Sequence, residues 1–186
     1  MTQQEILDRY EKTLEEGLVK ICSGAGLLNE IISSPDIDAK WDEYTKEYIE
    51  DAVANFNDYP EAALAWAAFL GMGVANNWDR DWKKHSKDNY RSYYGSRGWD
   101  DMDEHILYRQ LKLEKEYARK VSDTLDSCAL ATLGLIRHEG VEPQTALGFF
   151  ILARSYTVMF RIGAAIELKR SGYRKVLVDP SKIIRS

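Results

Sequence analysis

Apolar side chains recur every three or four residues along most of the chain, and this spacing constrains its fold more than any other feature. The first long stretch has apolar residues at Leu7, Tyr10, Leu14, Leu18, Ile21, Ala25, Leu28 and Ile32. Such spacing is typical of an α-helix with one apolar face. The longest alternation of period two is KVLVD at 175–179, which is too short to indicate a sheet of any size.

The pattern predicts an all-α fold, an antiparallel bundle of five main helices in one domain spanning 1–186. We expect the main helices over about 7–32, 34–56, 61–77, 101–138 and 143–171, with a short helix over 78–85 and an aromatic loop near 78–99. Ser34 followed by Pro35 is typical of a helix start. With 186 residues, of which 45% are hydrophobic, the chain is large enough for a substantial core.

The apolar stripes on the first helix and on the helix over 101–138 are longer than one small bundle needs to bury, which favours a homodimer. The longest uninterrupted apolar run has 14 residues, so no membrane partner is expected. The N-terminus lacks the basic start and apolar middle of a secretion signal, which indicates a cytoplasmic protein. Cys22 and Cys128 are far apart in sequence and are expected to be two buried free thiols.

Charge is unevenly distributed. The net charge of −5 makes nucleic-acid binding unlikely, although residues 169–186 carry six basic and one acidic side chain. The basic C-terminal segment, 172–186, could dock on the acidic N-terminal helices, on an acidic partner or on a nucleic acid.

Residues 78–105, WDRDWKKHSKDNYRSYYGSRGWDDMDEH, contain two Asp-x-x-x-His pairs, Asp81 with His85 and Asp101 with His105. An Asp and a His one helical turn apart can bind the same divalent cation, and two pairs would supply four ligands. The pattern therefore offers a metal-dependent hydrolase as one hypothesis. The alternative is that each His pairs with its own Asp on a solvated helix face. No other cofactor is expected.

The same stretch is rich in aromatic and basic side chains. They could form a wall that stacks on a planar ligand while the arginines hold an anion, or they could be a lid packed over the bundle end. Our main hypothesis is a non-enzymatic module that binds a partner protein or a small anionic or planar ligand through residues 78–108. Its candidate residues there are Trp78, Trp82, Tyr90, Tyr93, Tyr94, Arg97, Trp99 and Tyr108.

Arg154 and Arg161 are also candidate binding residues. They are seven residues apart, on one side of the most apolar helix, where an arginine needs an acceptor. The expected acceptors are an anionic ligand or one of the aspartates Asp79, Asp81, Asp100, Asp101 and Asp103.

Overall fold

Every regular element in the computed structural model, which describes residues 1–175, is helical, and no β-strand occurs within that range. The all-α prediction is confirmed. The elements are α1 (Gln3–Gly24), α2 (Pro35–Phe56), α3 (Pro60–His85), the 3-10 turns η1 (Tyr90–Tyr93) and η2 (Trp99–Asp101), α4 (Met102–Glu104), the π-helix η3 (His105–Gln110), α5 (Lys115–Glu139) and α6 (Ala146–Arg170).

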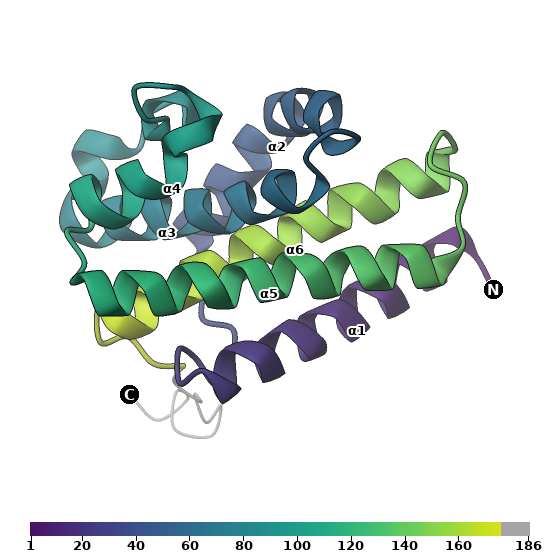
Figure 1. The fold of residues 1–186 in the computed structure, drawn as a ribbon, viewed down its shortest axis with the longest axis horizontal. Helices are drawn as coiled ribbons and strands as arrows, with labels where there is room; N and C mark the ends of the chain where they lie inside the picture. Colours follow the sequence, from purple (N-terminus) through teal and green to yellow (C-terminus); the bar gives the residue numbers. More distant parts are fainter. Residues whose placement is uncertain (176–186) are drawn as a thin grey trace, which may run out of the picture.

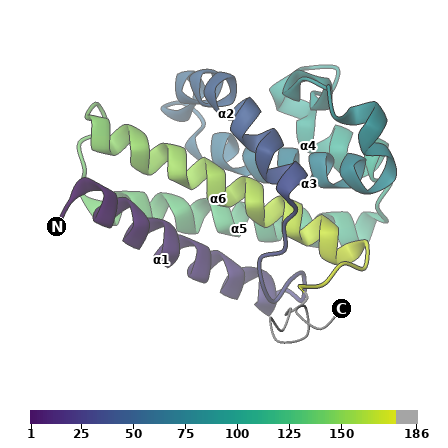
Figure 2. The same ribbon diagram turned by 180° about the vertical axis from the view of Figure 1, so that it is seen from behind.

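Three long helices, α1, α5 and α6, lie side by side (Figures 1 and 2). Helices α2 and α3 pack against α6, α3 also contacts α5, and α4 packs on α3. Arg9 near the start of α1 pairs with Glu139 at the end of α5, so these two helices are antiparallel. In contrast, Tyr10 bonds to Ser155, and Glu15 further along α1 pairs with Arg161 further along α6. Helices α1 and α6 therefore run in the same direction, and the arrangement is antiparallel only in part.

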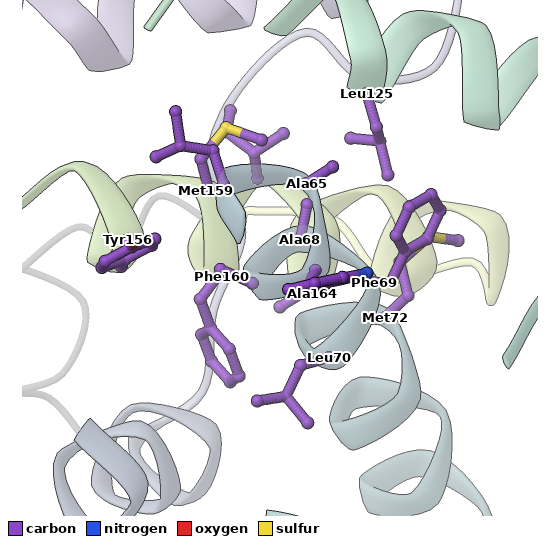
Figure 3. Close-up of a cluster of buried hydrophobic side chains, with 14 of the residues drawn as sticks. Ala65, Ala68, Phe69, Leu70, Met72, Leu125, Tyr156, Met159, Phe160 and Ala164 are labelled. Carbon is purple, nitrogen blue, oxygen red and sulfur yellow. The ribbon is translucent and has the colours of Figure 1, made fainter. Parts of the chain in front are cut away.

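The centre of the core is the contact between α3 and α6, where the two backbones approach closely. A Cβ atom added at Gly163 of α6 would lie 1.7 Å from the carbonyl oxygen of Ala68 in α3, and one added at Gly71 of α3 would lie 2.1 Å from the carbonyl oxygen of Phe160. Ala68 and Ala164 lie between the helices, with Phe160 beside them (Figure 3). Glycine and alanine at these positions allow the approach.

Side-chain caps fix several helix starts. The Ser34 hydroxyl accepts a hydrogen bond from the Ile37 amide at 3.1 Å, which confirms the predicted start of α2. The Thr145 hydroxyl accepts a hydrogen bond from the Gly148 amide at 3.1 Å. Helix α6 therefore begins at Ala146, three residues after the predicted start near 143.

The single helix predicted over 101–138 is wrong. The chain leaves helical geometry after η3, because the amides of Leu111 and Leu113 bond back to the carbonyls of Ile106 and Leu107, and Lys112 adopts a left-handed conformation with φ 54°. Leu111 is buried by this turn. Helix α5 then begins at Lys115 as a separate helix.

Helix α6 is long and apolar enough to cross a membrane by length and composition, and no other helix of the described range has this property. However, 61% of its most apolar window is buried against the rest of the fold. A central core helix of this kind accounts for that composition.

The apolar stripe of α1 packs within its own chain, since Leu7, Leu14 and Leu18 are all buried in the core. On α5, Val121 and Leu125 are buried as well, whereas Leu130 is exposed. Packing within one chain therefore buries most of the two stripes, and homodimer formation stays a prediction from the sequence.

Candidate functional site

A kink in α3 determines which side chains reach the bundle end. Asp81 has extended backbone angles inside the helix, with φ −164° and ψ 77°. Its carboxylate accepts a hydrogen bond from the Lys84 amide at 3.1 Å, as the first residue before a new helical turn commonly does. The spacing of Trp78, Asp81 and His85 places them on one face of a regular helix, but in the kinked helix only Asp81 and His85 line a common cavity.

Trp78 lies away from the two histidines. Its indole nitrogen donates a hydrogen bond to Asp36 at the start of α2, and its ring packs 5.3 Å from that of Tyr173. Trp82 is half-buried against the hydrophobic core. Both tryptophans therefore serve packing contacts in this structure.

His85 and His105 line the same cavity, which has a volume of about 520 Å³. His85 Nδ1 lies 2.7 Å from the carboxylate of Asp88, and not beside the Asp81 partner that the sequence suggests. His105 is the first residue of the π-helix. We call this cavity the terminal pocket; its lining residues are Asn77, Arg80, Asp81, Lys84, His85, Asp88, Ser92, Tyr93, His105, Arg109 and Gln110.

Buried polar side chains form part of the wall of the terminal pocket. The Asn77 amide donates a hydrogen bond to the Tyr93 hydroxyl at 3.0 Å, and Gln110 donates to the Gly73 carbonyl at 2.8 Å and to Asn77 at 3.2 Å. Burial raises the pKa of Tyr93, so its hydroxyl keeps its proton. Tyr93 accepts from Asn77, which leaves its own O–H group as a hydrogen-bond donor.

The pocket lining carries three cationic side chains and two carboxylates, an excess of one positive charge with both histidines counted as neutral. Arg80, Lys84 and Arg109 have no ion-pair partner among residues 1–175. Its two carboxylates are already engaged, Asp81 with a backbone amide and Asp88 with His85. Such a set can hold an anion by charge and by hydrogen bonds.

Asp101, the fourth residue of the expected metal site, does not line the terminal pocket. It is buried, and its carboxylate accepts hydrogen bonds from the Arg97 amide at 2.9 Å and the Ser96 hydroxyl at 3.0 Å. Burial alone would raise the pKa of Asp101, but these hydrogen bonds outweigh it and hold the pKa below its usual value. Asp101 thus closes the turn between residues 95 and 101.

The expected set of four metal ligands therefore does not come together. Within the described 1–175 range, no group of three or more His, Cys, Asp and Glu side chains is arranged to hold a metal ion. Asp81, His85 and His105 do line one cavity, but the Asp81 carboxylate bonds to the Lys84 amide and Asp101 bonds within its own turn.

Most of the aromatic loop is packed into the fold. The Trp99 ring lies 4.6 Å from Trp66 and 5.2 Å from both Tyr48 and Tyr94. Tyr90 is fully buried and its hydroxyl bonds to Asp51. This packing matches the lid alternative for these residues.

Three other candidate residues stand apart from that lid. Tyr93 lines the terminal pocket, whereas Tyr108 is exposed and does not. The Arg97 side chain is 68% exposed, and its Nε lies 3.9 Å from the Asp101 carboxylate.

Arg154 and Arg161 do not reach residues 79–103, so the expected acceptors are wrong. Arg154 pairs with Glu11, and Arg161 lies 3.5 Å from Glu11 and 3.4 Å from Glu15. The acceptors come from α1 because α1 runs beside α6 in the same direction, which repeats the contact along both helices. The two arginines fasten these helices together.

Sequence reasoning missed the basic residues Arg80, Lys84 and Arg109 and the amide side chains Asn77 and Gln110. The four-residue spacing of Arg80 and Lys84 was visible as a signal, but nothing in the pattern indicated that Arg109 would join them.

Comparisons with protein-family models, curated proteins and solved structures found no match to this chain. Function must therefore be inferred from the chemistry of the terminal pocket.

Proposed function

We propose that the protein binds a small anionic ligand in the terminal pocket. The observation that supports this most is the convergence of Arg80, Lys84 and Arg109, without ion-pair partners in the described range, around one cavity of about 520 Å³. A cavity of this size suits a small molecule.

The expected ligand has phosphate or carboxylate groups. Arginine binds both through paired N–H groups, and lysine adds a point charge. Tyr93 can donate a hydrogen bond to the same ligand. Since Tyr90 and Trp99 pack in the fold, the proposal does not rest on stacking against a planar ring.

The other functional hypotheses gain no such support. A hydrolase that binds its metal through Asp81, His85, Asp101 and His105 would need Asp101 to leave its buried hydrogen bonds. Binding of nucleic acid or an acidic partner through 172–186 concerns a segment that lies mostly outside the described residues. Homodimer formation and a cytoplasmic location stay expectations from the sequence.

Calorimetric titration of the full chain at low ionic strength, with pyrophosphate and with citrate as probes, tests the proposal. We expect saturable binding of at least one probe, and K84Q and R109Q should each weaken it by roughly tenfold or more, because each removes a charged hydrogen bond. K83Q is the matched control, since Lys83 is an exposed neighbour that does not line the pocket.

Absence of binding by either probe at millimolar concentration would reject the proposal as stated. An equal loss of affinity in K83Q would reject the assignment of the ligand to this pocket, since it would indicate general attraction to surface charge.

A further inference from the structure

The only two cysteines of the chain, which lie 106 residues apart, are in contact in the fold. Cys22 is in the last turn of α1 and Cys128 is in the middle of α5, and their sulfur atoms are 3.7 Å apart. Both side chains are fully buried. The two helices lie side by side in both views (Figures 1 and 2).

We propose that Cys22 and Cys128 are a redox modification site, which low-molecular-weight disulfides convert to an intramolecular disulfide tying α1 to α5. A disulfide has an S–S length of about 2 Å, so the sulfurs must approach by less than about 2 Å. A side-chain rotation with a small shift of the end of α1 supplies such a movement. The bond would close a loop of more than half of the chain.

The position of Cys22 gives a reagent access to a buried pair. Cys22 lies two residues before the end of α1, and Gly26 follows with φ 75°. Helix ends open locally with a lower free energy than the core. Opening of this last turn would expose Cys22, whereas Cys128 lies in the middle of α5, away from either end of that helix.

The two thiols are suited to different steps. The hydrogen bond between them lowers the pKa of Cys22, and the same contact together with burial raises the pKa of Cys128. The thiolate is the reactive form of a cysteine. Because Cys22 also lies in the last turn of α1, where local opening exposes it, Cys22 is the attacking sulfur and Cys128 the resolving one.

With oxidised glutathione, the Cys22 thiolate attacks one sulfur of the reagent, forms a mixed disulfide and releases one glutathione thiolate. Cys128 then loses its proton and attacks the Cys22 sulfur, which breaks the mixed disulfide and releases the second glutathione thiolate. Two protein thiols are oxidised and one molecule of glutathione disulfide is reduced to two thiols, so electrons and protons balance.

Intact-mass spectrometry of the reduced full chain, incubated with oxidised glutathione under native conditions, tests the proposal. The wild type should lose the mass of two hydrogen atoms and keep no glutathione. C128S should retain one glutathione on Cys22, and C22S should react much more slowly. If C128S does not fold by circular dichroism, C128A replaces it.

Oxidation should also raise the Tm by roughly 10 °C, because a disulfide across so long a loop restricts the unfolded chain. A wild type that retains glutathione, or a disulfide between two chains, would overturn the proposal. So would a native protein whose thiols are still reduced after the time in which the urea-unfolded chain is completely oxidised.

Discussion

Replacement of Gly163 by alanine should strongly destabilise the protein, because the α3–α6 crossing has no space for a methyl group. The added Cβ would lie 1.7 Å from the Ala68 carbonyl oxygen, and such contacts are not found below 3.0 Å, so the helices must separate by about 1.3 Å. Overpacking of a core costs about 1–3 kcal/mol, and here backbone must move. The gain in helix propensity from Gly to Ala offsets about 1 kcal/mol. Because backbone atoms must move, we expect a cost at the upper end of that range and a net loss of about 2 kcal/mol.

Gly134 provides a matched control, since it also lies within a long helix, α5. A Cβ added there has no atom within 4 Å, so only the propensity term acts, and G134A should stabilise by about 1 kcal/mol. For a chain of this size, 1 kcal/mol corresponds to about 2–4 °C in Tm. Urea unfolding followed by far-ultraviolet circular dichroism should therefore give midpoints that move in opposite directions. A G163A protein as stable as the wild type would refute the close approach of the two backbones.

Three further changes test separate contacts. E11Q removes the carboxylate shared by Arg154 and Arg161 and should lower the unfolding free energy by about 1 kcal/mol at low salt and by less at high salt. Denaturant titrations at two salt concentrations measure the two losses. A loss that does not depend on salt would contradict the ion-pair explanation. S34A removes the α2 cap and should cost about 1 kcal/mol in the same assay, whereas an unchanged midpoint would show that the cap is unimportant. Because the pKa of Asp101 is lowered in the folded state, its contribution to stability is present above the unfolded pKa near 4 and is lost as the pH falls through the folded pKa. D101N should therefore flatten the acid limb of a profile of Tm against pH. An unaltered acid limb would contradict this role of Asp101.

The fold class and several helix starts could be predicted from the sequence because local physics determines them. The stripe that includes Leu7 and Leu14 needs only one face to be buried, and the Ser34 cap acts within three residues. The break before α5 could not be predicted, because the spacing from Ile106 to Leu113 and Tyr117 still fits one helical face. Bonds from the Leu111 and Leu113 amides replace the helical ones there, and nothing in the apolar spacing indicates them.

Long-range contacts set the limits for the site in the same way. The acceptors of Arg154 depend on α1 lying beside α6, and the meeting of Cys22 with Cys128 depends on α1 lying beside α5. The sequence did identify the stretch in which His85 and His105 occur, and both line the terminal pocket. It could not identify Arg109, since that position is brought to the pocket by the turn of η3.

Two departures from regular helical geometry border the terminal pocket, the kink at Asp81 in α3 and the π-helix η3 from His105 to Gln110. Each leaves backbone N–H or C=O groups without the partners that a regular helix provides, so each needs another contact to compensate. The Asp81 carboxylate caps the turn after the kink, and Gln110 bonds to the α3 backbone. Departures of this kind concentrate at functional sites, because the geometry that places a ligand-binding group need not be the most stable one. A straight α3 and a regular helix over 105–110 would place His85 and Arg109 differently, so the two irregular segments determine where these pocket-lining side chains lie.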